Sequence, residues 1–332
     1  MNNNLLCCKN IKEEIQRDIY FDILKGILII LVVIGHILQL GSDRLSVTMV
    51  NFIYSFHMPL FILVSGYFSN FKSKSYIKSI FRLLEIFLVF QLIHSVLNDS
   101  INSHTLLTPR FALWYLLSLV YWKIMLLILP NKVRLNVLIF ITSSIILCLA
   151  SGLVNISTEL SFQRTFAFMP FFVVGYLLRS YDYRQLLHRI NYIISITACI
   201  FAFVMLFFIN TNFLTCFSGT TFLINNWGGY IMSRILILLC GSVISISIMR
   251  ISLVIKKSRL LSNIGQASLH IYIYHTFFYL YLFKPLTEHG FLPNSFPYLI
   301  IYSLFIILVL YFTSKVKLLN IIMNPFTNLL NI

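Results

Sequence analysis

The sequence predicts an all-α polytopic membrane protein with about ten transmembrane helices and both termini in the cytoplasm. Three observations support this prediction. Of 332 residues, 59% are hydrophobic and only 11% are charged, whereas soluble domains carry about a quarter charged residues. Apolar runs near the twenty residues that a helix needs to cross a bilayer recur along the chain. Basic residues collect in alternate connections between these runs.

The apolar runs define ten candidate spans joined by short connections. They lie at about 19–40, 47–68, 80–97, 111–129, 133–152, 164–179, 190–210, 228–249, 263–283 and 295–314. The third and sixth are short and carry polar residues. We therefore assign 1–18 to a cytoplasmic tail, 19–315 to one transmembrane domain and 316–332 to a second cytoplasmic tail.

The net charge of +15 follows from the distribution of basic residues. Twenty of the 25 lysines and arginines fall near the N-terminus, in alternate connections or after the last span. This is the positive-inside pattern, and it supports an even number of spans. It also explains the charge without a nucleic-acid partner, because no basic domain or nucleic-acid motif accompanies it.

The six cysteines indicate neither a disulfide framework nor a metal site. They form no C-x-x-C pattern, and four of them lie in or beside apolar runs. We expect no metal and no bound cofactor. The first apolar run contains Asp22 and Lys25 and lacks a following small-residue cleavage site, so we expect no cleaved signal peptide.

The first span carries three ionisable residues, Asp22, Lys25 and His36. At about 100° per residue, Lys25 and His36 lie within about 20° of one face, and Asp22 within about 60° of it. Lys25 and His36 are separated by about 16 Å along the axis. Ionisable groups in a membrane indicate a functional site. The structural alternative for His36 is a hydrogen bond between helices. Asp22 is about 21 Å away and cannot orient His36, so a carboxylate partner would have to be Glu85.

The second span combines His57, Pro59 and Ser65. Proline frees backbone groups within a helix, which is tolerated where protein or water satisfies them. His57 and Ser65 are therefore candidates to line a reaction path. The alternative is a kinked helix with a buried histidine and a small packing contact at Ser65.

A basic segment leads into the third span. Arg82 lies three residues from Glu85, on one helical face, and the two could pair. Arginine also matches phosphate groups bidentately, so Arg82 is a candidate for holding a phosphate-bearing donor. For Lys72 and Lys74, contact with lipid headgroups is the favoured interpretation.

Three further candidates lie later in the chain. Trp114 belongs to an aromatic segment that is also typical of a membrane interface. Arg164 is one of few basic residues on the predicted outer side. His275 lies seven residues after Ser268 and within about 20° of its face, whereas His270 points elsewhere and favours a structural role.

Several of these motifs together resemble a known family. They are D-x-x-K-G-I at Asp22–Ile27, Gly35-His36, SFHMPLF with SGYF, ALWYLLSL, FMPFFVVGYLL and IGQASLHIYIYH, in that order. The chain resembles the membrane-bound acyltransferase-three family, and within it the branch described as fucose 4-O-acetylase-like. The resemblance extends from about Arg17 to about residue 315, and its most specific signals are His36 and the FHMPLF…SGY stretch.

The resemblance implies a ten-span O-acyltransferase in the bacterial inner (cytoplasmic) membrane. Such enzymes move an acyl group, usually acetyl from cytoplasmic acetyl-CoA, to a hydroxyl of a glycan or lipid-linked glycan across the membrane. The family's essential histidine aligns with His36 and its basic partner with Lys25. Its R-x-x-R motif falls on Ser79-x-x-Arg82, so the first arginine is missing here.

These interpretations together give the expected site. The expected catalytic residues are His36, His57, Ser65 and His275, the donor-binding residues are Asp22, Lys25 and Arg82, and the acceptor-side residues are Arg164 and Trp114. His36 acts either as general base on the sugar hydroxyl or as a transient acetyl acceptor. Acetyl-CoA is a co-substrate, and the other partners are the glycan acceptor and membrane lipids.

Two other functions fit a polytopic membrane protein. A transporter or flippase for lipid-linked glycans also places charges and broken helices in the membrane, but we find no inverted repeat or paired interrupted helices. A glycan polymerase usually needs a large outer loop, and the longest one here, about 211–227, is small and uncharged.

Overall fold

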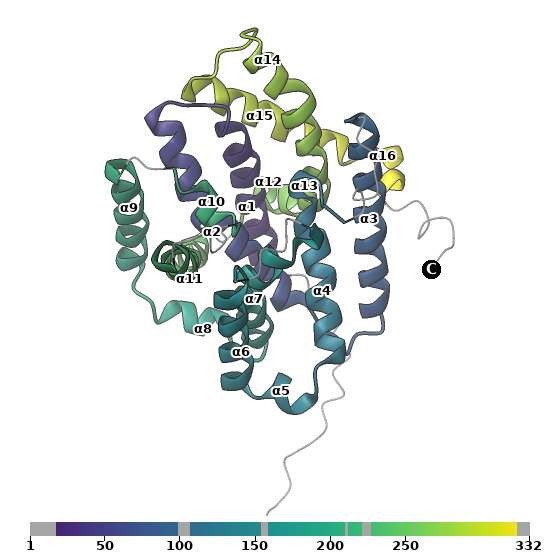
Figure 1. Ribbon diagram of the computed structural model, residues 1–332, viewed down its shortest axis with the longest axis vertical. Helices are drawn as coiled ribbons and strands as arrows, with labels where there is room; N and C mark the ends of the chain where they lie inside the picture. The colour runs from purple at the N-terminus through teal and green to yellow at the C-terminus, as the bar shows by residue number, and fades with distance from the viewer. Residues whose placement is uncertain are drawn as a thin grey trace, which may run out of the picture.

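The computed structural model describes residues 18–98, 107–153, 159–209, 212–220, 227–255 and 257–323. Within these ranges every regular element is helical (Figure 1). The predicted N-terminal tail, except for Asp18, lies outside the described residues.

Each of the ten predicted spans coincides with a helix or a group of helices. The longer helices are α1 (Ile19–Leu38), α2 (Arg44–Phe68), α3 (Tyr76–Leu97), α4 (Trp114–Ile128), α6 (Val137–Ala150), α7 (Phe162–Leu178), α9 (Tyr192–Ile209), α11 (Trp227–Ser252), α13 (Ser268–Phe277) and α15 (Phe296–Thr313). The shorter ones are α5 (Asn131–Leu135), α8 (Tyr183–His188), α10 (Leu214–Phe217), α12 (Arg259–Gln266), α14 (Lys284–Glu288) and α16 (Lys317–Met323). Short 3₁₀ turns cover Phe111–Leu113 and Glu159–Ser161, and a π-helix covers Phe278–Phe283.

The length and composition of these helices make the chain a multi-pass membrane protein. Among the described residues, seven helical segments are long and apolar enough to cross a membrane, and α6 is a shorter apolar helix. α3 has 22 residues, so the expectation of a short third span is wrong.

The prediction of one continuous helix over 263–283 is also wrong. The chain leaves helical geometry at Ala267, where φ is −85° and ψ is 5°, so α12 and α13 are separate helices. Beyond α13 the helix widens into the π-helical turn. α12 is polar on one side and amphipathic, which explains why an apolar-run criterion did not find its beginning at Arg259.

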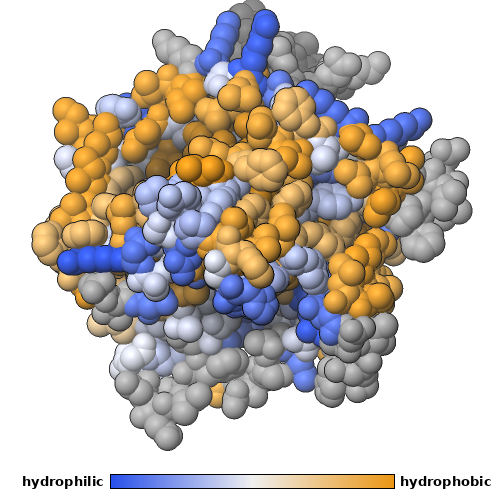
Figure 2. Space-filling model, turned by 90° about the horizontal axis from the view of Figure 1, so that it is seen from above, coloured by the Kyte–Doolittle hydropathy of each residue, from blue (hydrophilic) through white to orange (hydrophobic). Residues whose placement is uncertain are grey.

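The helices differ strongly in burial. α1 and α2 lie near the centre of the molecule, whereas α3 and α9 lie at opposite edges (Figure 1). Most residues of α2 are buried, while Ser195 is the only one of α9 that is buried. Large apolar side chains are exposed on α3, α9, α11 and α15. Such exposed apolar side chains are expected where a helix contacts lipid. Figure 2 shows, from above, apolar side chains over much of the face and hydrophilic side chains across its centre and lower part.

Contacts between the ends of helices agree with the predicted alternation of sides. Arg184 pairs with Asp18 at 2.8 Å, and both belong to segments predicted to be cytoplasmic. Arg44, in a predicted outer connection, donates to the carbonyl of Phe207 at 2.7 Å, and Phe207 lies near the predicted outer end of the span 190–210.

Glycines allow two helix pairs to touch through their backbones. In the α1–α12 pair, a Cβ on Gly26 would lie 2.1 Å from the carbonyl oxygen of Leu261, and one on Gly265 would lie 1.8 Å from that of Asp22. This is the small-residue packing expected between membrane helices, where close backbone approach replaces hydrophobic drive. Gly26 is therefore needed because α12 crosses α1 at that point.

The α2–α7 pair follows the same rule at Gly66 and Gly175. A Cβ on either would lie about 2 Å from a carbonyl oxygen of the other helix, at 2.1 and 1.9 Å respectively. Both helices also contain an internal proline after a methionine, at Met58-Pro59 and Met169-Pro170. The similarity of these two stretches does not by itself predict that they pack together.

Substitution of Gly26 by alanine is expected to destabilise the protein by about 1–3 kcal/mol, because the added methyl group meets backbone that cannot rotate away. Thermal unfolding in detergent, followed by size-exclusion fluorescence, measures the change. Gly241→Ala is the control, because the nearest atoms to its Cβ are the ring ends of Phe171 and Pro59. Equal stability of the two variants would contradict the backbone contact.

Candidate active site

Two cavities lie along α1, near its two ends. The first has a volume of about 370 Å³ and is lined by His36 of α1, His57 of α2 and Arg164 of α7. The second has a volume of about 300 Å³ and is lined by Lys25 of α1, Ser65 of α2 and Lys123 of α4. We name them the histidine cavity and the lysine cavity. His36 and Lys25 thus line different cavities, whereas Asp22 lines neither.

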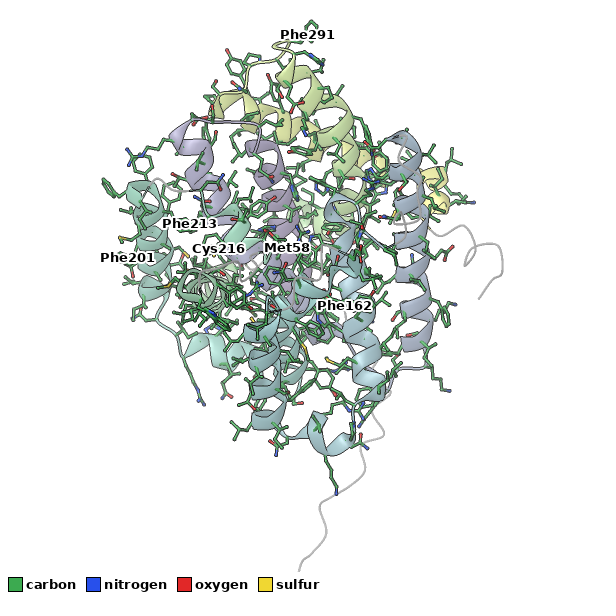
Figure 3. The ribbon with its side chains drawn as sticks, in the orientation of Figure 1. Met58, Phe162, Phe201, Phe213, Cys216 and Phe291 are labelled. Carbon is green, nitrogen blue, oxygen red and sulfur yellow. The ribbon has the colours of Figure 1, made fainter. Side chains whose placement is uncertain are left out.

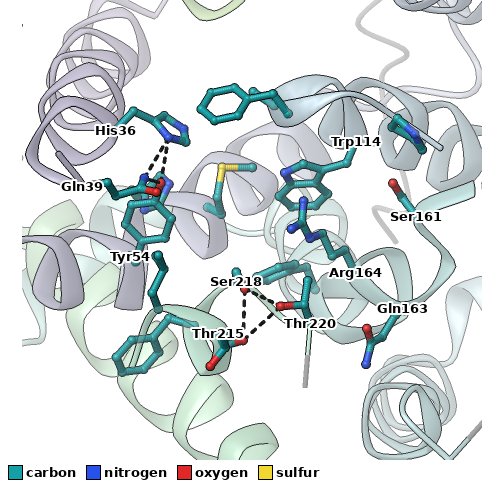
Figure 4. A pocket seen from close by; sticks show the side chains of 18 of the residues that line it. His36, Gln39, Tyr54, Trp114, Ser161, Gln163, Arg164, Thr215, Ser218 and Thr220 are labelled. Atoms are coloured by element: carbon teal, nitrogen blue, oxygen red, sulfur yellow. Dashed lines mark hydrogen bonds between the residues drawn. The ribbon is translucent and has the colours of Figure 1, made fainter. Parts of the chain in front are cut away.

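His36 is fixed through one ring nitrogen. Its Nδ1 lies 2.8 Å from the hydroxyl oxygen of Tyr54 and 3.1 Å from the side-chain amide of Gln39, which also contacts Tyr54. Figure 4 shows these groups on one side of the cavity. An amide can present either its oxygen or its nitrogen. When the Tyr54 hydroxyl oxygen or the Gln39 amide oxygen accepts a hydrogen bond from Nδ1–H, Nε2 keeps a lone pair, which is the form that a general base requires. Within the described part of the chain no carboxylate hydrogen-bonds this ring, and Glu85, the carboxylate that the sequence suggested, does not line the cavity.

Two other histidines lie beside His36. The ring of His275 is 5.1 Å from the ring of His36, between centroids. His275 donates through Nδ1 to the carbonyl of Ile271 at 3.1 Å, and its buried Nε2 has no hydrogen-bond partner among the described residues. His57 donates through Nδ1 to the carbonyl of Ile53 at 2.8 Å. Both rings, when neutral, therefore present an Nε2 lone pair that accepts hydrogen bonds and does not donate them.

The opposite side of the histidine cavity carries the only guanidinium in its lining. Arg164 is half-buried, its guanidinium carbon lies 5.1 Å from the centre of the Trp114 ring, and it forms no ion pair within the described ranges. Figure 4 shows Trp114 and Arg164 across the cavity from His36. The structure thus brings the predicted acceptor-side residues together with three of the predicted catalytic ones.

The segment after α9 forms another wall of the histidine cavity. Thr215, Ser218 and Thr220 line it from α10 and the turn that follows. The hydroxyls of Ser218 and Thr220 lie 2.8 Å apart, and Ser218 donates to the carbonyl of Thr215 at 3.0 Å. The sequence predicts only a short outer loop over 211–227. The closely spaced hydroxyl residues Thr215, Ser218 and Thr220 are the sequence feature that could have indicated a polar binding surface here.

A buried glutamine positions the remaining wall. Gln91 of α3 donates to the carbonyl of Thr108 at 2.8 Å and accepts from the backbone N–H of Arg110 at 2.9 Å. These two bonds hold the segment that places Phe111 and Ala112 against the cavity. A single glutamine in an apolar run does not predict that its side chain positions a distant loop.

The lysine cavity contains two half-buried ammonium groups. Lys25 pairs with Asp22 at 3.0 Å. Lys123 donates to the hydroxyl of Ser79 at 2.9 Å, stands 4.5 Å from the centre of the Tyr76 ring, and pairs with no acidic side chain within the described part of the chain. Lys123 was counted only as a basic residue near a connection, so its place in the cavity is a finding of the structure.

Besides Asp22 and Lys25, two of the predicted residues lie apart from His36. Ser65 lines the lysine cavity, where its hydroxyl lies 2.6 Å from that of Tyr115 and donates to the carbonyl of Phe61 at 3.0 Å. The histidine contact that a serine nucleophile requires is therefore replaced by a tyrosine contact. Arg82 is exposed on α3 and lines neither cavity.

Tyrosine side chains separate the two cavities. Tyr272 of α13 lines both, and its ring lies 5.4 Å from the ring of Tyr115, edge to face. Tyr272 donates to the carbonyl of Ala112, and Tyr115 is held by Ser65. The described side chains include no group of three histidine, cysteine or acidic residues that could hold a metal ion.

Replacement of Gln91 by leucine is expected to loosen 107–113, because it leaves the carbonyl of Thr108 and the N–H of Arg110 without their partner, at about 1–3 kcal/mol for each buried group. Hydrogen–deuterium exchange of that peptide measures the effect. Gln266→Leu is the control, since Gln266 is exposed and contacts only Ser262 at 3.4 Å. Unchanged exchange in Gln91→Leu would show that other contacts hold the segment.

Comparison with known proteins supports the resemblance seen in the sequence. The family model described as "Acyltransferase domain" matches residues 18–315. Nodulation protein NolL of Sinorhizobium fredii is 52% identical over 60 residues, which are 17% of this chain and 16% of that protein. The protein of the same name from Mesorhizobium japonicum is 50% identical over 60 residues, with the same coverage of 17% and 16%. The aligned part is thus about a sixth of these curated relatives. No solved structure matches the chain.

The family match covers both cavities, from the start of α1 to the end of α15. The chain therefore belongs to the membrane-bound acyltransferase-three family, and is a multi-pass membrane acyltransferase.

Proposed function

We propose that this protein is an O-acetyltransferase of the bacterial inner membrane, which transfers acetyl from cytoplasmic acetyl-CoA to a sugar hydroxyl of a cell-surface glycan or its lipid-linked precursor. The observation that carries the proposal is the pair of cavities on the two sides of Tyr272, one cationic and one lined by histidines. Membership of the fucose 4-O-acetylase-like branch is part of the same proposal.

The lysine cavity suits the donor. Coenzyme A carries phosphates, and two ammonium groups in a partly dry cavity attract anions more strongly than they would in water. Asp22 neutralises part of the charge on Lys25, so Lys123 supplies the larger free charge. Ser79, which receives the bond from Lys123, is the position where the resemblance has an arginine. Lys123 thus brings a cation from α4 to that place. Arg82, which is exposed on α3, would bind the phosphates of the donor before it enters the cavity.

The histidine cavity suits a sugar. It combines aromatic walls with hydroxyl, imidazole and guanidinium groups, as binding sites for polar molecules do. The hydroxyl to be acetylated would donate to Nε2 of His36. His57 would accept a second sugar hydroxyl, since its neutral ring offers a lone pair. Arg164 and Trp114 would position the rest of the acceptor.

Acetyl transfer then takes two steps, an addition to the thioester carbonyl and an elimination of the thiol of coenzyme A. His36 Nε2 removes the proton of the hydroxyl as its oxygen attacks the thioester carbonyl and forms the new C–O bond. The C–S bond of the tetrahedral intermediate breaks, and the imidazolium returns the proton to the departing thiolate. Tyr54 and Gln39 hold the ring throughout. The pantetheine arm would pass the layer of Tyr115 and Tyr272 to bring the thioester to His36.

A transporter or flippase remains the other candidate class. It would need the cavities to carry a glycan and would not consume acetyl-CoA. Acetyl-CoA turnover by the purified protein separates the two classes.

His36→Ala is expected to lower acetyl transfer by about 10²–10⁴-fold, the usual contribution of a general base. The assay is acetyl-ester content of the surface glycan in cells, with protein abundance measured in the same membranes. His270→Gln is the matched control, because His270 bonds Thr313 at 3.2 Å and lines neither cavity. Full acetylation in the His36 variant would overturn the assignment.

Lys123→Ala is expected to raise the KM for acetyl-CoA by about tenfold and to change kcat less, because the lost charge binds the donor without touching the reacting atoms. Lys123→Arg should retain most of the affinity. Lys132→Ala, at an exposed lysine outside both cavities, is the control. A loss confined to kcat would instead assign Lys123 to the reaction itself.

A further inference from the structure

An apolar groove adjoins the histidine cavity. It has a volume of about 390 Å³ and runs between α9 and α11, with Ser55 of α2 at its base. Phe217 lines both this groove and the histidine cavity. Figure 3 shows Phe213 and Cys216 between α9 and the centre of the molecule, with Met58 of the histidine cavity further inward. Only the layer of side chains that includes Phe217 therefore separates the groove from the site.

The groove has the dimensions of a lipid tail held in one leaflet. Along α9 it extends from Ala198 to Ile209, which is about 16 Å of helix. This is about half of the roughly 30 Å hydrocarbon core of a bilayer. Its lining is apolar except for Ser55 and Cys240, and the hydroxyl of Ser55 donates to its own helix at 2.7 Å. The groove therefore accepts a hydrocarbon chain and offers little to a polar ligand.

We infer that this groove holds the hydrocarbon tail of an acceptor in which the glycan is joined to an isoprenoid lipid through phosphate. The inference rests on the proposed function and specifies its acceptor. With the tail beside Phe217, the head of the lipid enters the histidine cavity, where Arg164 supplies the positive charge for a phosphate. The sugar then lies next to His36. The groove thus binds the lipid tail of the acceptor, and the histidine cavity binds its phosphate and sugar.

A second apolar groove serves as an internal comparison. It has a volume of about 490 Å³ between α4, α6 and α7, includes Ser143 and Phe162, and shares no lining residue with the histidine cavity. Phe162 marks its place in Figure 3. Bulk lipid would fill both grooves alike, whereas the acceptor would select the groove beside Phe217.

The test uses the full protein in nanodiscs of phosphatidylethanolamine and phosphatidylglycerol with a geranylgeranyl diphosphate that carries a photoreactive diazirine at its tail. We expect cross-links on peptides of α9 and α11. Ala202→Phe, which fills the groove, should reduce these cross-links by about tenfold. Ser143→Phe, which fills the other groove, should leave them unchanged. Ala202→Leu gives a graded change and, with thermal stability, distinguishes a filled groove from a misfolded protein.

Two further arms identify the ligand. Arg164→Gln should weaken capture of the diphosphate probe but not of the corresponding photoreactive alcohol. Unlabelled polyprenyl diphosphate should compete, and excess phosphatidylglycerol should not. Equal labelling of both grooves, or competition by phosphatidylglycerol, would overturn the inference and leave an ordinary lipid contact. Cross-linking needs no turnover, so a failed acetyl-transfer assay and a failed groove assay are separate outcomes.

Discussion

A transmembrane helix that carries Asp22, Lys25 and His36 is stable in a bilayer only when protein or enclosed water covers its polar residues. Much of the fold can be understood as the means by which α1 is covered. α12 crosses it at Gly26, α2 supplies Tyr54 beside His36, and α13 brings His275 to the same ring. α9, whose apolar side chains are largely exposed, contributes little to this cover. The lipid bilayer thus explains both observations: α1 is buried because lipid disfavours its ionisable residues, and α9 is exposed because lipid accepts its apolar residues.

The coverage of α1 also divides its chemistry by depth. Lys25 and His36 lie on nearly the same face, yet they line different cavities, because Tyr115 and Tyr272 occupy the space between. A cation that attracts an anionic donor and a base that meets a hydroxyl have different requirements for charge and water. Their separation allows each to have its own surroundings on one rigid helix.

The sequence predicted the parts of the fold that depend on local composition. Apolar length located the regions of the longer helices, and the ionisable residues of α1 indicated a site because their cost in a membrane is large. His57, His275, Arg164 and Trp114 were expected near His36, and the structure places them there. What the sequence could not provide was proximity between distant segments. Lys123, the Gln91 bonds and the α10 wall depend on tertiary contacts that leave no periodic pattern. For the same reason, Ser65 was assigned to chemistry although Tyr115 is its partner.

The glycine contacts restrict how a molecule can pass from one cavity to the other. α1 with α12, and α2 with α7, touch through backbone, so neither pair can slide or separate without losing its packing. In the proposed reaction the donor arm passes between the cavities within this fixed frame, and rotation of the Tyr115 and Tyr272 rings, which is far faster than helix rearrangement, would admit it. The width of that passage would then depend on these two side chains. Relatives that replace them with smaller residues would gain room for a longer acyl group without any change in the frame.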